Sequence, residues 1–348
     1  MDERSYADLV ALCQFLPGPA SSQVGIGIGL MRGGIIGAIL AFIGFTLPSV
    51  LALTLFALFM QGMDLADAGW IHGLKLVAVA IVAHAVYGMG QKLATGRSRL
   101  TIAVAAASVA LLWPTPATQV LLIVCAGAIG VILYRETSEA ASSHVTIRLS
   151  RTAGVICLFL FIVLLGLLPV LRESTGAEWL AVFDSFYRSG SLVFGGGHVV
   201  LPLLEREFVP TGWISSEDFL AGYGAAQAVP GPLFTFASYI GAIWGGWMGA
   251  LLATVAIFLP AFLLVIGVLP FWQSLRRNAR MRSALTGVNA AVVGILLAAL
   301  YDPIFTSTVA SAADFALAAA LFVMLQSWRL PPWVIVIVGA AGGMIIST

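Results

Sequence analysis

Charge is what this sequence has least of. Asp, Glu, Lys and Arg make up 9% of its 348 residues, whereas 60% are hydrophobic and the mean hydropathy is +1.02. A soluble domain carries about 25% charged residues, so the chain lacks the charge to cover a water-facing surface. Its net charge is +1, and no basic run interleaved with aromatic residues appears, so no nucleic-acid partner is expected. The composition predicts a protein embedded in a lipid bilayer.

Sequence motifs for enzymes and metal sites are also missing. The three cysteines, Cys13, Cys125 and Cys157, show no CxxC or Cys/His spacing, so no metal site is expected. No GxxxxGK[ST], HExxH or GxSxG motif occurs, which removes the usual signatures of ATP hydrolysis and of two hydrolase classes. We therefore expect neither an enzyme nor a bound cofactor.

Long apolar runs dominate what is present. They are continuous rather than alternating, which favours helices over strands, and an open sheet edge is not tolerated in lipid. The prediction is an all-α polytopic membrane protein with about twelve hydrophobic segments, at roughly 9–30, 33–60, 68–90, 98–113, 117–134, 152–171, 185–204, 218–240, 242–271, 284–301, 308–326 and 331–347.

The two halves of the sequence resemble each other. LPGP at Leu16–Pro19 recurs as VPGP at Val229–Pro232, and the FTLP run at Phe45–Pro48 recurs as IFLP at Ile257–Pro260. We interpret residues 1–134 as one transporter repeat, 135–184 as a linker with one connecting span, and 185–348 as a second repeat.

Loop charges predict that the second repeat is inverted. The loop at 61–68 carries two aspartates and no base, whereas its counterpart at 273–283 carries four arginines. Lys and Arg gather on cytoplasmic loops, so opposite bias indicates opposite orientation. Inverted repeats are a transporter architecture in which the substrate site lies between the repeats, near the middle of the membrane.

The alignment of the halves leaves one segment without a counterpart. The first-repeat equivalent of Ser185–Glu207 would lie entirely before Met1. We therefore expect the first repeat to be N-terminally incomplete, and an inactive truncated membrane remnant stands as a rival to an active transporter.

The two Pro-Gly-Pro sequences are the strongest site signal. Proline inside a helix costs about 3 kcal/mol, so two prolines around a glycine predict a break. A new helix then begins with unpaired N–H groups, which suit an oxyanion; a structural kink is the alternative. The candidate substrate-binding residues at these breaks are Gln14, Pro17, Gly18, Pro19, Ser21, Ser22, Gln23, Gln227, Pro230, Gly231 and Pro232.

A glycine run supplies a third candidate region. Gly195, Gly196 and Gly197 precede His198 in an apolar segment, where they permit close approach of a ligand or another helix. His198 and Glu205 would share one helix face and are the candidates for proton coupling, with an interfacial cap as the alternative for the acidic cluster.

One basic residue lies inside a predicted span. Lys75 is a candidate counter-charge for an anion if it faces inward, and snorkelling is its alternative. Its repeat partner, Asn289, would supply a neutral donor, and His84 is a weaker candidate on the same span as Lys75.

These residues resemble the signature of the chromate ion transporter (CHR) family, of the long type with two homologous halves. The resemblance rests on the runs Cys13–Gln23, Gly44–Ser49, Phe194–His198, Pro202–Glu205 and Gln227–Pro232. It implies a multi-pass protein of the cytoplasmic (inner) membrane that exports chromate by secondary active transport. Sulfate would compete or exchange with chromate, because it is a tetrahedral dianion of similar shape.

Other assignments remain open. The substrate could be another inorganic or organic anion, while a channel is less supported because no filter sequence is repeated. The expected partners are a chromate- or sulfate-like oxyanion and the lipid bilayer; a homo-oligomer is left open.

Overall fold

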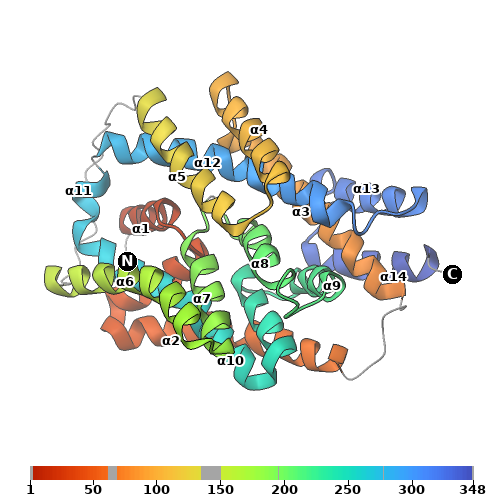
Figure 1. Cartoon of the computed structure of the whole chain (residues 1–348), viewed down its shortest axis with the longest axis horizontal. Coiled ribbons are helices and arrows are strands. Elements are labelled where there is room, and N and C mark those ends of the chain that lie inside the picture. Colours follow the sequence, from red (N-terminus) through yellow and green to blue (C-terminus); the bar gives the residue numbers. More distant parts are fainter. Residues whose placement is uncertain (1–2, 62–68, 135–149, 195, 277, 347–348) are drawn as a thin grey trace.

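The computed structural model describes residues 3–61, 69–134, 150–194, 196–276 and 278–346, and these residues form helices and no strands (Figure 1). The all-α prediction is confirmed. The linker at 135–149, the acidic loop at 62–68 and Gly195 lie outside the described residues. The helices are α1 (Glu3–Phe15), α2 (Ala20–Gln61), α3 (Gly69–Leu93), α4 (Arg97–Leu112), α5 (Pro116–Leu133), α6 (Arg151–Thr175), α7 (Glu178–Ser191), η1 (Gly197–Val199), α8 (Val200–Phe208), α9 (Ser216–Ala226), η2 (Leu233–Thr235), α10 (Phe236–Val268), η3 (Leu269–Phe271), α11 (Trp272–Arg276), α12 (Ala279–Ala299), η4 (Leu300–Phe305), α13 (Ala312–Gln326) and α14 (Pro332–Ile346).

Among the described residues, five stretches are long and apolar enough to cross a membrane: Ala20–Gln61, Gly69–Leu93, Arg151–Thr175, Leu233–Phe271 and Ala279–Phe305. They differ in how much protein surrounds them. Only 11% of the most apolar window of α6 is buried, against 67% in the α12–η4 stretch. The apolar side chains of α6 therefore face outward to the bilayer, whereas α12 lies inside the bundle.

The two longest helices, α2 and α10, each bend back on themselves at a Gly-Gly pair. Gly33 and Gly34 have φ/ψ of −138/20° and 61/−152°, and Gly245 and Gly246 have −144/28° and 59/−144°. A Cβ added to Gly29 would lie 2.3 Å from the carbonyl oxygen of Gly37. Each long helix is therefore two packed arms, as the turn predicted between segments 9–30 and 33–60 requires.

Helices from opposite ends of the chain pack together. The first-half helices α4 and α5 pack on α12, and the last two helices, α13 and α14, pack on α3 (Figure 1). The closest approaches are between small residues: a Cβ on Gly73 would lie 2.1 Å from Gly339 O, and one on Gly287 would lie 2.1 Å from Ala126 O. Small residues at helix contacts let the backbones come close together in membranes.

A contact between a histidine and an aspartate also joins α3 to α13. His72 Nε2 lies 2.6 Å from Asp314 Oδ1, and Asp314 in turn accepts hydrogen bonds from the amides of Ala310 and Ser311 at the start of its helix. A carboxylate at this place also complements the positive end of the helix dipole. Asp314 thus stabilises the N-terminus of α13 and connects this helix to α3, which belongs to the first half of the chain.

Candidate functional site

Three breaks in the helices lie next to one another. The first (Leu16–Pro19) separates α1 from α2, the second (Leu192–Phe194 and Gly196) separates α7 from η1, and the third (Gln227–Pro232) separates α9 from η2. The amide of Gly18 donates to Val193 O at 2.7 Å, joining the first break to the second. A Cβ on Gly197 would lie 3.5 Å from Leu233 Cβ, which brings the second break against η2, the element that follows the third.

Each break contains a glycine with a positive φ angle. Gly18 has φ 112°, Gly196 has φ 140° and Gly231 has φ 144°, values that L-residues rarely adopt. Gly231 also touches α2, where Ser49 Oγ donates to Pro230 O at 2.5 Å. The prediction of helices broken at Pro-Gly-Pro and at the glycine run is confirmed.

At the first break, a side chain from the start of α2 forms a hydrogen bond with the broken backbone. Gln23 Nε2 donates to Pro17 O at 2.7 Å, and this bond satisfies a carbonyl that the break leaves without a helical partner. Ser22 Oγ and Gln23 Oε1 are buried without a hydrogen-bond partner among the described residues, whereas Gln14 and Ser21 are exposed. Of these candidates, Ser22 and Gln23 have polar atoms buried beside the break.

His198 lies in a buried polar group. Its Nδ1 is 2.9 Å from the hydroxyl of Tyr223, which is fully buried. Gln227 lies beside the same hydroxyl, and His84 lies close enough to His198 to interact with it electrostatically. The structure thus places three candidates, His198, Gln227 and His84, near one another. Tyr223, which contacts His198, was not predicted, because a tyrosine in an apolar run carries no distinguishing signal.

Other candidates lie apart from this group. Lys75 Nζ is 3.8 Å from Glu217 Oε1 on the first turn of α9, so its counter-charge is an exposed glutamate. Asn289 is half-buried on α12, the helix that packs on η1. Glu205 is half-buried on α8, near the charges of Arg206 and Asp302.

A charged network between α6, α7 and α8 was not anticipated. Arg188 Nη2 lies 3.0 Å from Asp184 Oδ2 and 3.1 Å from Glu207 Oε2. Ser185 Oγ donates to the same Glu207 oxygen at 2.9 Å, and Arg172 Nη1 lies 3.6 Å from Asp184 Oδ2. The Glu207 carboxylate is buried and is paired with Arg188 and Ser185. Arg188 inside the apolar segment 185–204 was the available signal.

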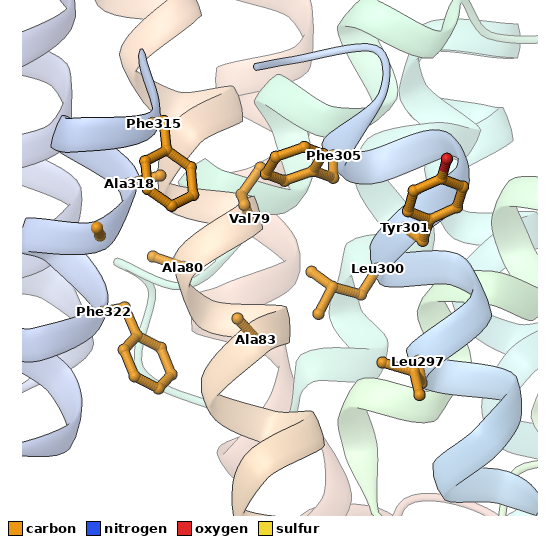
Figure 2. A pocket seen from close by; sticks show the side chains of 11 residues that line it. Val79, Ala80, Ala83, Leu297, Leu300, Tyr301, Phe305, Phe315, Ala318 and Phe322 are labelled. Atoms are coloured by element: carbon orange, nitrogen blue, oxygen red, sulfur yellow. The ribbon is translucent and has the colours of Figure 1, made fainter. Parts of the chain in front are cut away.

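The large apolar cavities are unsuited to an oxyanion. One of about 470 Å³ lies between α3, the α12–η4 junction and α13. Figure 2 shows that its wall consists of aliphatic and aromatic side chains and that the Tyr301 hydroxyl is the one polar side-chain atom among the labelled residues. A dianion there would lose its hydration without gaining hydrogen bonds. This cavity therefore does not suit an oxyanion, whereas polar and charged side chains gather at the breaks and in the charged network.

Comparison with known proteins identifies the family of this chain. The sequence matches the model of the family described as Chromate transporter over residues 1–131 and 180–344. The chain belongs to the chromate transporter family. Its resemblance to that family, read from the motifs, is confirmed, and chromate transport is the role that the family supports.

Curated relatives match along nearly the whole chain. The chromate transport protein of Pseudomonas aeruginosa is 27% identical over 352 residues, which cover 98% of this chain and 82% of that protein. A probable chromate transport protein of Synechococcus elongatus is 27% identical over 99% of this chain and 86% of its own length. The chromate transport protein of Cupriavidus metallidurans is 25% identical, covering 86% and 72%. No solved structure matches this chromate transporter family member.

Proposed function

We propose that this chain is a secondary active transporter that exports chromate across the cytoplasmic membrane, with sulfate as a competitor or exchange partner. The observation that carries the proposal is the meeting of the helix breaks around Gly18, Val193 and Leu233. Unpaired backbone donors at new helix starts are ready-made anion sites. Irregular backbone inside a membrane is tolerated where it is buried in protein or lines a cavity.

The matched features of the two halves support inverted repeats over 1–134 and 185–348, with 135–184 as the linker. Gly18 and Gly231 adopt similar φ values in their breaks, and the Gly-Gly bends of α2 and α10 have nearly equal dihedral angles. Rocking of one repeat against the other would expose the breaks alternately to the two sides of the membrane.

The substrate contacts follow from this arrangement. The N–H groups at the start of α2, the Ser22 hydroxyl and the second N–H of the Gln23 amide would donate to oxyanion oxygens. The proposed coupling residue is His198, whose Nδ1 contacts the Tyr223 hydroxyl, because an imidazole can both accept and donate a proton. Transport of another anion is the second candidate, since backbone donors recognise charge and shape rather than the central atom.

Transport itself is the first expectation to test. Everted membrane vesicles that contain the chain should accumulate chromate saturably, and excess sulfate should reduce the rate because both dianions compete for the same donors. The measurement is radioactive chromate uptake, with vesicles lacking the chain as control. An inserted, folded chain that moves neither anion would contradict the proposal; uptake of a different anion alone would favour the second candidate.

His198→Gln should reduce chromate transport driven by a proton gradient at least about tenfold, a typical size for coupling between two sites. Exchange of chromate against sulfate without a gradient should persist, because glutamine cannot carry the proton but fills a similar space. The measurement compares both modes in vesicles. His72→Gln, at the contact between α3 and α13, is the matched control, and equal gradient-driven rates in the two variants would remove His198 from coupling.

A further inference from the structure

A small polar cavity lies between α5, α7 and α8, next to the second break. These three helices meet near the middle of the molecule in Figure 1. Its volume is about 110 Å³, and its polar lining consists of Gln119, Arg188, Ser189 and Glu207. One water needs about 10–15 Å³ of such volume. The cavity therefore has room for an anion with four oxygens.

Arg188 brings more donors to this cavity than its neighbours use. Its contacts with Asp184 and Glu207 both involve Nη2, while its Nε is buried without a hydrogen-bond partner among the described residues. The Oγ of Ser189 is likewise buried and unpaired. A guanidinium has five N–H donors, and buried donors are normally satisfied. Unused donors beside a cavity indicate a ligand with oxygen acceptors.

Glu207 already shows where one ligand oxygen would lie. Its Oε2 accepts from Ser185 Oγ at 2.9 Å and from Arg188 Nη2 at 3.1 Å. Both donors meet a single carboxylate oxygen, an arrangement that an oxygen of a free oxyanion could take over. Ser185 is also supported from α6, since Arg172 Nη1 lies 3.4 Å from its Oγ.

The charges around the cavity balance. Arg172 and Arg188 face Asp184 and Glu207, and on α8 Arg206 faces Glu205. From α5 the cavity receives the neutral Gln119. An added dianion would therefore meet uncompensated repulsion unless one carboxylate withdraws. Glu207 is the carboxylate that would withdraw, because it lines the cavity, whereas Asp184 lies outside the lining, near Arg172 and Arg188.

The cavity also borders the proposed transport route. Arg188 and Ser189 belong to the last turns of α7, directly before the second break. The next residue of α7, Gly190, has its carbonyl oxygen 3.5 Å from where a Cβ of Gly18 would be, and Val193 O accepts from the Gly18 amide. The same end of α7 thus touches the first break and carries the charged lining of the cavity.

We propose that this cavity is an oxyanion subsite of the transporter, in which the carboxylate of Glu207 is a tethered stand-in that an incoming tetrahedral dianion displaces from Arg188 and Ser185. The inference rests on the proposed function and adds to it Arg188 as a ligand and Glu207 as a competitor. A purely structural ion pair, the alternative, would hold α7 to α8 and leave anion affinity unaffected.

Binding of chromate and of sulfate to the purified full chain in lipid nanodiscs, measured by titration calorimetry, separates these two roles. Glu207→Gln keeps the size of the side chain but removes the competing charge, so the chromate Kd should fall at least about tenfold. Arg188→Lys should raise the Kd about tenfold, because an ammonium lacks the forked donors. Glu173→Gln and Arg151→Lys, exposed on α6, are the matched controls.

The results of these titrations distinguish an oxyanion subsite from a purely structural ion pair. If the wild-type chain binds chromate and Glu207→Gln binds it no more tightly than Glu173→Gln, the subsite is overturned and the proposed function stands. If the folded wild-type chain binds neither anion, both fall. Should Arg188→Lys fail to fold, Ser185→Ala takes its place, with weaker binding expected and unchanged binding counting against the subsite.

Discussion

Gly231→Ala should abolish chromate transport and destabilise the third helix break. A side chain at φ 144° is strained, and its Cβ would lie 2.0 Å from Ser49 Oγ, which donates to Pro230 O. Backbone strain of this kind costs about 1–3 kcal/mol and a lost hydrogen bond about 1 kcal/mol. Thermal unfolding in detergent and chromate uptake into vesicles measure the two consequences.

Two further variants identify the cause. Gly166→Ala on α6 is the control, because its Cβ would meet no atom within 4 Å. The double variant Gly231→Ala/Ser49→Ala removes the clash but not the strain, so it should recover part of the stability and little of the transport. Wild-type transport by Gly231→Ala would show that the break does not need its observed backbone conformation.

Gly73→Val should prevent α14 from packing on α3. The new Cβ would lie 2.1 Å from Gly339 O and 2.9 Å from the Cα of Ala340. Both are backbone atoms, so rotation of a side chain cannot relieve the clash. The two helices must move apart instead. Overpacking typically costs about 1–3 kcal/mol, and we expect the upper end of that range or more. The measurement is the amount of folded chain recovered from membranes, together with its melting temperature.

The same substitution elsewhere tests the relation between the halves. Gly287→Val, whose Cβ would lie 2.1 Å from Ala126 O, should be as damaging as Gly73→Val, because α5 packs on α12 as α14 packs on α3. Gly88→Val on α3 meets no atom within 4 Å and should be tolerated. If Gly73→Val melts at the temperature of Gly88→Val, close backbone contact is not what joins α3 to α14.

Much of the fold was open to prediction from local chemistry. Lipid favours long apolar helices and satisfied backbone groups, so the spans follow from hydropathy alone. Proline and glycine act within one or two turns, so the breaks at Pro17–Pro19 and Pro230–Pro232 and the turn at Gly33–Gly34 could be placed from the residues themselves. The family resemblance rested on the same short motifs.

The candidate site was predicted only in part. The glycine run and His198 were placed in it from sequence, but Tyr223, whose hydroxyl lies 2.9 Å from His198 Nδ1, was not. Lys75 was singled out for its charge within a span, and the structure places it beside Glu217. Sequence spacing pointed to Glu205 as the partner of a histidine, whereas Glu207 is the glutamate that accepts from Ser185 and Arg188.

By itself the sequence determined that the chain is a helical membrane protein, where its helices break, and which family it resembles, because hydrophobicity, proline and glycine act on their own segment of chain. Only the tertiary structure decided that α4 and α5 pack on α12, that α13 and α14 pack on α3, and that Arg188 shares a carboxylate oxygen with Ser185. These contacts join residues far apart or across a break, and they depend on which backbones approach closely enough for small residues to touch.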